Sequence, residues 1–351
     1  MNSYERVKRA IEFTGPDRLP IAGDCMQYAK HGDVIYHFPK MSGYAWWRGD
    51  GGGTDEWGCQ WETNRQDDMG QLLKHPLEDI AGFKGLPRPN GADQSRYEDL
   101  TRELPERPDA YHVFCNGSCL FERMHFLRGF DQLLMDMALY PEEFKTFADW
   151  VVHYQEETID YLAKHFAGRV HALRCTDDLG TQINSIMSPG QFRELLKPFY
   201  GRVARLCHDH GMHFWLHSCG KIDGLLDDLI EAGVDVINMF QPNLFNLEEL
   251  GRRFAGRIAF ENYPDVQLSV PTGRRDVIRA DIAEQLARLA APKGGYIAAH
   301  LAPSHLKAQC NVADPGMADY ITAAFAELDP FAAGKKDPER VETPGANSRP
   351  G

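Results

Sequence analysis

The sequence lacks the features that would mark a membrane, secreted or nucleic-acid-binding protein. No apolar run approaches the ~20 residues that cross a bilayer. Residues 1–12 are charged and helical in pattern, without the apolar core of a secretory signal. Lys and Arg form no run, and the net charge is −13, which argues against a nucleic-acid partner. We therefore expect a cytoplasmic protein that binds neither nucleic acid nor membrane.

Nucleotide-binding signatures are also missing. No Gly-x-Gly-x-x-Gly follows a strand-like segment, which argues against a dinucleotide crevice. The run Gly51-Gly52-Gly53 lacks the lysine of a phosphate-binding loop.

The cysteines do not form a disulfide pattern. Eight are scattered through the chain, and without a secretory signal most should be reduced, buried, small apolar residues. Cys115 and Cys119 are four apart, but no second pair is in view to complete a metal site with them.

Short apolar segments alternate with longer amphipathic ones along the 351 residues. The strands we predict span 18–23, 111–115, 170–175, 213–216, 234–240, 257–260 and 295–299. The helices we predict span 3–13, 122–137, 141–166, 189–210, 222–232, 247–254, 276–289 and 315–328. Such alternation indicates βαβ units and a parallel sheet. We predict an α/β fold, a (β/α)8 TIM barrel forming a single domain over 1–330, although the strand count also permits a doubly wound sheet.

Two regions depart from this alternation. Residues 32–109 are rich in turn residues and aromatics, and we interpret them as an N-terminal insertion that covers the barrel, although it could hide an eighth strand. Its tryptophans, at positions 46, 47, 57 and 61, suggest a packed lid more than a cofactor box. Residues 331–351 are rich in Pro, Gly, Lys and Glu, which predicts a disordered tail.

The run His217-Ser218-Cys219-Gly220 follows an apolar strand and precedes an amphipathic helix. Side chains at i and i+2 of an extended backbone point the same way, so this imidazole and thiol can hold one small object. One nitrogen and one sulfur suit zinc. Taken alone the pattern is short, and a free thiol beside a pocket histidine fits it as well or better.

Polar side chains follow the predicted strands. In a parallel barrel the carboxyl ends of the strands form the active-site rim. The residues at these ends are Asp24, Asn116, Asp177, Asp178, His217, Cys219, Gln241, Glu261, Asn262, His300 and His305. A third ligand from segment 300–310 would give a three-ligand site with an open position, as in catalytic zinc sites.

Several segments together resemble the uroporphyrinogen decarboxylase-like superfamily. They are ERVKRAIEFTGPDRLPI near the start, DEWGCQWE followed by HPLED, DDLGTQ with SPGQFRELLKPFY, LHSCGKIDGLLDDLIEAGVDVINMFQP, and APKGGYIAAHLAPSH. The resemblance spans nearly all of residues 3–328. It implies a (β/α)8 fold and one of two activities: cofactor-free decarboxylation of uroporphyrinogen, or zinc-dependent methyl transfer between a methyl-corrinoid protein and a thiol such as coenzyme M.

The decarboxylases of this superfamily carry Met-Arg-Gln-Ala-Gly-Arg after the first strand, to bind propionate groups. Here residues 24–30 read Asp-Cys-Met-Gln-Tyr-Ala-Lys. Both arginines are missing, which argues against a porphyrinogen substrate.

The methyltransferases carry a His-x-Cys pair and a later cysteine as zinc ligands. His217 and Cys219 match the pair, and the later position falls near His305, with Cys310 as the rival. The resemblance implies that the corrinoid (cobalamin) belongs to a separate partner protein. In this hypothesis zinc binds the acceptor thiol and lowers its pKa, and the thiolate attacks the methyl group on Co(III). The chain could also form a homodimer.

The remaining candidates have both a functional and a plain interpretation. Asp177, Asp178, Glu261 and Asp24 are candidate catalytic or orienting residues, although the aspartates could cap a helix and Glu261 could form a simple salt bridge. The candidate cofactor-binding residues are Asn116, Gln241 and Trp57.

Two other functions remain open from the sequence. One is a metal-free decarboxylase or lyase for a smaller carboxylate, using Asp24 or Asp178 with His305. The other is a non-catalytic subunit that binds a corrinoid or another ligand.

Overall fold

The computed structural model describes residues 1–23, 32–44, 51–62 and 70–332. Its centre is a curled sheet of seven parallel strands in the order β1-β5-β6-β7-β8-β9-β10. The strands are β1 (Val34–His37), β5 (Tyr111–Ser118), β6 (Ala172–Thr176), β7 (His213–Ser218), β8 (Val236–Met239), β9 (Ala259–Asn262) and β10 (Tyr296–Ala298). The fold is therefore α/β and resembles a TIM barrel, as the alternation predicted.

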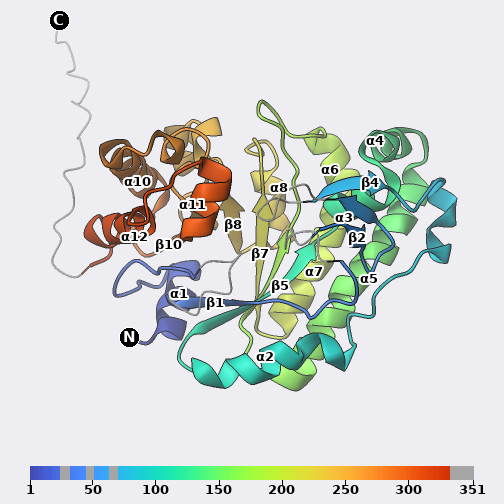
Figure 1. The fold of residues 1–351 in the computed structure, drawn as a ribbon, viewed down its shortest axis with the longest axis horizontal. Helices are drawn as coiled ribbons and strands as arrows, with labels where there is room; N and C mark the ends of the chain where they lie inside the picture. Colours follow the sequence, from blue (N-terminus) through green and yellow to red (C-terminus); the bar gives the residue numbers. More distant parts are fainter. Residues whose placement is uncertain (24–31, 45–50, 63–69, 333–351) are drawn as a thin grey trace, which may run out of the picture.

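Helices cover the outside of the curled sheet (Figure 1). The α-helices are α1 (Ser3–Ile11), α2 (Glu98–Glu103), α3 (Phe121–Arg128), α4 (Phe130–Leu139), α5 (Pro141–Phe166), α6 (Pro189–Leu195), α7 (Lys197–Asp209), α8 (Leu226–Ala232), α9 (Leu247–Phe254), α10 (Arg275–Leu289), α11 (Pro303–Cys310) and α12 (Met317–Glu327). Short 3-10 turns span Ile80–Gly85, Gln94–Tyr97, Leu104–Glu106, Pro242–Leu244 and Val270–Thr272. None of the helices in the described ranges is long and apolar enough to cross a membrane.

Most helix predictions are confirmed, and α5 and α9 have the predicted bounds. The helix predicted over 122–137 is divided into α3 and α4 by Gly129, which adopts φ +93°. Helix α11 was not predicted. Its first residue is Pro303, and its segment was expected to be a loop that carries the third metal ligand.

One of the seven predicted strands is not a regular strand in the structure. Segment 18–23, predicted as a strand, contributes only two isolated parallel bridges, one between Ile21 and Ala298 of β10 and one between Ala22 and Val34 of β1. A closed barrel of eight regular strands is not seen among the described residues.

The insertion over 32–109 is also not wholly outside the sheet, because it contains β1. The rest of it includes a small antiparallel sheet of β2 (Gly53–Thr54), β3 (Gln60–Glu62) and β4 (Gln71–Lys74). Sequence periodicity gave no signal for β1, because all four of its residues are buried and it shows no alternation.

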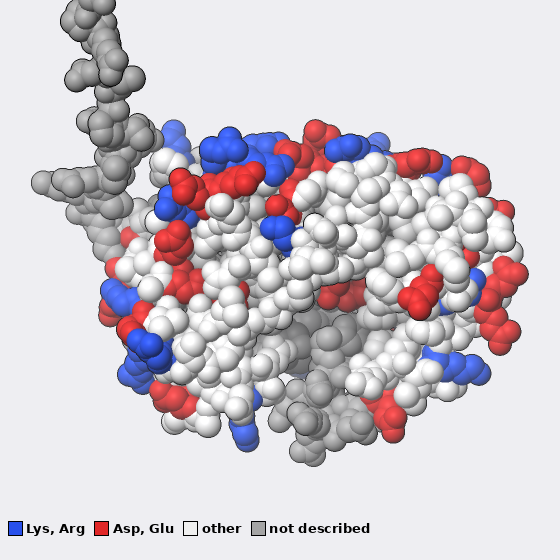
Figure 2. Space-filling model, turned by 90° about the horizontal axis from the view of Figure 1, so that it is seen from above, with Lys and Arg blue, Asp and Glu red and all other residues white. Residues whose placement is uncertain are grey.

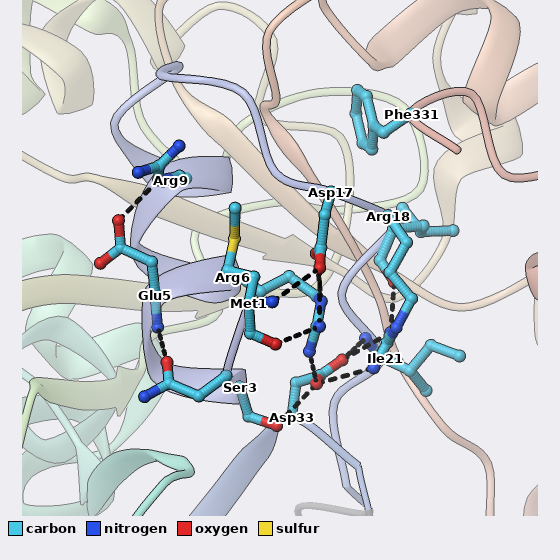
Figure 3. Close-up of polar contacts among 12 residues, drawn as sticks. Met1, Ser3, Glu5, Arg6, Arg9, Asp17, Arg18, Ile21, Asp33 and Phe331 are labelled. Carbon is cyan, nitrogen blue, oxygen red and sulfur yellow. Dashed lines mark hydrogen bonds and ion pairs between the residues drawn. The ribbon is translucent and has the colours of Figure 1, made fainter. Parts of the chain in front are cut away.

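A buried carboxylate holds this N-terminal arrangement together (Figure 3). Asp33, just before β1, accepts hydrogen bonds from Ser3 and Arg6 of α1 at 2.8 and 2.7 Å. It also accepts two from Arg18 and one from the backbone N–H of Ile21. Because one side chain bonds α1, segment 18–21 and the start of β1, it fixes their relative positions.

The strands separate two apolar regions. Phe214 and Leu216 of β7 pack on the outer side of the sheet, with the helices. Trp215 packs on the inner side, in one cluster with Tyr111 and Val7 of α1. The period-2 alternation also places His217 on the interior face, at the carboxyl end of β7. The amino end of the interior is thus packed and apolar, and the carboxyl end carries polar side chains.

Candidate metal centre

Three potential metal ligands converge at the carboxyl ends of β6 and β7. The Nε2 atom of His217 lies 3.4 Å from the Sγ of Cys219 and 3.6 Å from Oδ1 of Asp178. In the part of the chain that the structure describes, this is the one group of three such residues whose ligand atoms all lie within 4.8 Å of one another. The backbone N–H of Cys219 also donates to Asp178 Oδ1 at 2.8 Å, which holds the carboxylate beside the pair.

Two glycines let the loops after β6 and β7 cross closely enough to bring these ligands together. Gly220 adopts φ +79°, and a Cβ there would lie 2.3 Å from the carbonyl carbon of Gly180. Lys221 N–H donates to Thr181 O at 2.7 Å, and the N–H of Gly220 donates to the side chain of Gln241. The predicted cofactor residue Gln241 therefore bonds the loop that carries Cys219.

Burial disfavours the charged forms of both sequence-predicted ligands. It lowers the pKa of His217, an effect that the carboxylate of Asp178 opposes. It raises the pKa of the Cys219 thiol well above its usual value, and Asp178 and Glu122 raise that pKa further. A cation bound between these groups would offset the effect on Cys219, because it stabilises the thiolate. It would act in the same direction as burial on His217, because it binds the neutral imidazole.

Glu122, in the first turn of α3, was not predicted as part of the site. Burial, followed by the charges of Asp178 and Asp177, raises the pKa of Glu122 to about 8. Its carboxylate accepts a hydrogen bond from Thr176 at 2.6 Å. The sequence offered no signal for it, because a glutamate in a first helical turn is usual.

The adjacent aspartates have different environments. Asp177 is fully buried, and its oxygens accept backbone N–H groups of Leu120, Phe121 and Glu122 at the start of α3, together with the Tyr200 hydroxyl. Burial raises the pKa of Asp177 to about 6 against these hydrogen bonds. Its geometry therefore corresponds to the capping interpretation, although it caps α3 and not the helix that follows it in sequence.

Two more predicted residues, Glu261 and Asn116, form their contacts away from the three-residue group. Glu261 is buried on β9, where it accepts the Tyr36 hydroxyl and lies 3.7 Å from Nε of Arg174. Burial raises the pKa of Glu261. Asn116 of β5 donates to the side chain of Gln155 at 2.7 Å.

The expected third ligands are on α11, outside the three-residue group. The ring of His305 lies 6.2 Å from that of Phe240, and the same phenyl ring lies 5.8 Å from the ring of His217. Cys310 donates to the carbonyl of Val266, and burial raises its pKa to about 11. Asp178 occupies the place beside the pair that these residues were expected to fill.

The predicted lid lies partly outside the described residues, as do Trp46, Trp47 and Asp24. Trp57 is buried, and its ring meets the edges of Trp150 and Tyr154 of α5. Trp61 donates to Asp55 at 3.0 Å. Both described tryptophans thus pack the insertion against helices of the barrel, Trp57 against α5 and Trp61 against Phe126 of α3.

The carboxyl ends of the strands point toward the upper side of the molecule as drawn in Figure 1. Figure 2 views the molecule from above and shows acidic atoms within a hollow near the middle of this face. Most of the other charged side chains in that view lie around the periphery.

Comparison with known proteins agrees with this architecture. The structure is similar to a methyltransferase from Methanosarcina mazei, with a TM-score of 0.66 at 14% identity, covering 93% of this chain and 99% of that one. Weaker likenesses include a D-psicose 3-epimerase from Clostridium cellulolyticum H10, with a TM-score of 0.42 at 14% identity over 66% of this chain and 82% of that one. No curated protein matches the chain. The model of the uroporphyrinogen decarboxylase (URO-D) family matches residues 94–300, and the chain therefore belongs to this family.

Proposed function

We propose that this protein is a zinc-dependent methyltransferase that moves a methyl group between a corrinoid protein and a thiol. His217, Cys219 and Asp178 hold the metal, and the corrinoid is carried by a separate partner protein. The proposal gives Asp178 the ligand position for which the sequence suggested His305 or Cys310.

The spacing of the donor atoms is the observation that carries this proposal. With bonds of about 2.3 Å to sulfur and about 2.0–2.1 Å to nitrogen and oxygen, the edges of a tetrahedral zinc site measure roughly 3.3–3.6 Å. Two of the three edges are 3.4 Å from His217 to Cys219 and 3.6 Å from His217 to Asp178, and all three ligand atoms lie within 4.8 Å of one another. A nitrogen, a sulfur and an oxygen are all zinc donors, and three protein ligands leave one position open.

The chain's residues would divide the chemical work among them. Zinc, when bound, supplies a Lewis acid that lowers the pKa of a substrate thiol, so that a thiolate exists at neutral pH. Asp178 and Cys219 supply negative charge to the site. Glu122, whose pKa of about 8 leaves it largely protonated at pH 7, is a candidate to accept the thiol proton in its ionised fraction.

The similarity to the Methanosarcina methyltransferase supports the methyltransferase assignment over the other activities. The match to the URO-D family keeps decarboxylation as a second candidate. That reaction would use Asp178 as an acid or base with no metal. It predicts an active protein that contains no zinc.

Metal content of protein purified without chelator tests the proposal. We expect about one zinc per chain in the wild type and in Cys310→Ala, and none above background in Cys219→Ala. Cys310→Ala is the matched control, because it removes a buried thiol that lies outside the group. The zinc-loaded protein should then demethylate a methyl-corrinoid in the presence of a thiol.

Equal zinc in wild type and Cys219→Ala would contradict the assignment of the site. A folded wild type that holds no zinc but releases CO2 from a small carboxylate would favour the decarboxylase.

A further inference from the structure

A network of buried polar side chains lies directly behind the candidate metal centre, inside the curled sheet. It joins His217 on β7, Asn238 on β8, Arg174 on β6 and Glu261 on β9. Asn238 and Arg174 are 2% and 6% exposed, and Glu261 is fully buried. All four project inward, so the network crosses the interior between neighbouring strands.

The amide of Asn238 has one orientation that satisfies its partners. Its Nδ2 lies 2.6 Å from the backbone carbonyl oxygen of Glu261, which can only accept, so this atom must be the amide nitrogen. The opposite atom, Oδ1, therefore faces Arg174 and His217. The guanidinium donates to that oxygen at 3.2 Å, which agrees with the same orientation because arginine has no acceptor.

This orientation determines what His217 must do. Its Nδ1 lies 2.5 Å from Asn238 Oδ1. An amide oxygen only accepts, so Nδ1 must carry a hydrogen. In a neutral imidazole the other nitrogen then has a lone pair, and that nitrogen, Nε2, is the atom 3.4 Å from the Cys219 sulfur.

We propose that Asn238, held by Arg174 and the carbonyl of Glu261, fixes His217 as the Nδ1–H tautomer before any metal binds. Asn238 and Arg174 are then positioning residues, because they act through His217. The tautomer itself follows from the contacts alone. The role of this tautomer in binding zinc rests on the function proposed above.

The charge of Glu261 completes this arrangement. Arg174 brings a positive charge close to a site proposed to hold a divalent cation, which would disfavour the cation. The carboxylate of Glu261, 3.7 Å from Arg174 Nε and bonded by Tyr36, offsets that charge. The sheet interior can thereby supply a hydrogen-bond donor to Asn238 without an uncompensated positive charge behind the metal.

Nitrogen NMR of the metal-free wild type tests the tautomer without any variant that might fail to fold. In protein with 15N-labelled histidine, His217 is assigned by the signal lost in His217→Gln. We expect a protonated Nδ1 and an unprotonated Nε2 at pH 7.5. A protonated Nε2, or two nitrogens averaged between the states, would overturn the inference.

Two matched variants then test the positioning role. Asn238→Leu removes the acceptor from His217. Asn262→Leu removes a similarly buried amide, whose Oδ1 accepts from Met239 N–H and whose contacts do not include His217. We expect the first to lose the fixed tautomer and weaken zinc binding about 10–100-fold, and the second to change neither.

The outcomes separate this inference from the proposed function. Equal zinc affinity in folded Asn238→Leu and Asn262→Leu would overturn the positioning role even if the wild type is a zinc enzyme. A wild type with the fixed tautomer but no zinc would overturn the function and leave the tautomer assignment standing.

Discussion

Two histidines of strand β7, His213 and His217, face the same interior side at opposite ends of the strand. His213 is bonded through Nδ1 to the Tyr111 hydroxyl at 2.5 Å, and its Nε2 lies 3.6 Å from Glu12 at the end of α1. His217 is bonded through Nδ1 to Asn238, and its Nε2 faces the Cys219 sulfur. One ring therefore links structural elements, and the other directs a lone pair toward potential metal ligands.

Burial is shared by the two rings and does not distinguish them. It lowers the pKa of both His213 and His217. What differs is the environment of Nε2: a single carboxylate of α1 at the amino end, and a thiol with a carboxylate on a crossing loop at the carboxyl end. The partners of each ring nitrogen, and not burial, therefore distinguish His217 from His213.

The largest effect is expected from replacing each of these histidines by glutamine. His217→Gln should weaken zinc binding more than about 100-fold. Losing a metal ligand costs more affinity than losing a residue that only hydrogen-bonds to a ligand, which costs about 10–100-fold. His213→Gln should keep the metal and lower the free energy of unfolding, because its hydrogen bonds join β7 to β5. Isothermal titration with zinc and urea unfolding measure the two effects. Zinc binding lost in both variants would remove the distinction.

The adjacent aspartates give a second pair with opposite expectations. Asp178→Asn keeps an acceptor for the Cys219 N–H but replaces a charged ligand by a neutral, weaker amide oxygen, so zinc affinity should fall by roughly 100-fold with stability little changed. Asp177→Asn should retain zinc and lose about 1–2 kcal/mol of stability, because the amide keeps one acceptor oxygen and turns its NH2 group toward other donors at the start of α3. If Asp177→Asn reduced zinc binding more than Asp178→Asn, the assignment of the two roles would be reversed.

The smallest effect concerns acid stability at the amino end of the sheet. Burial lowers the pKa of His112 to about 4 and that of His171 to about 3. The unfolded chain protonates these rings near the ordinary value of 6.5, so it binds more protons than the folded state below that pH. The contribution of these two neutral rings to the free energy of unfolding is therefore fully present above about pH 6.5 and declines as the pH falls toward 4.

His171→Asn tests this contribution. Asparagine can retain the acceptor for the His112 backbone N–H, which His171 Nδ1 now accepts at 2.8 Å. The variant should reduce the slope of stability against pH between 6.5 and 4 by up to about one proton. An unchanged slope would show that His171 does not carry the acid sensitivity.

The sequence predicted more of the fold than of the site. Helix α5 begins at its proline and was placed with its observed bounds, because its period and its N-terminal proline are local signals. Strand β1 could not be found, since its pairing with β5 is a tertiary contact and its four buried residues resemble any apolar segment. The pair His217 and Cys219 was predicted from its i, i+2 spacing on an extended backbone.

The third residue of the candidate metal centre, Asp178, was not predictable from spacing. Asp178 lies about forty positions before Cys219, and only the register of β6 against β7, with Thr176 opposite His217, brings them together. His305 was expected from the resemblance, but its segment forms α11, and its ring packs against Phe240. Asn238 belongs to no sequence motif. Its proposed role depends on which atom of His217 it contacts, and only the structure shows this.

X-ray absorption at the zinc edge of the zinc-loaded wild type would identify the atoms that bind the metal. We expect one sulfur at about 2.3 Å and the remaining ligands nitrogen or oxygen at about 2.0–2.1 Å, with the sulfur lost in Cys219→Ala. Two sulfurs in the first shell would place Cys310 at the metal in place of Asp178. A shell without sulfur would contradict the assignment of Cys219 and with it the centre described here.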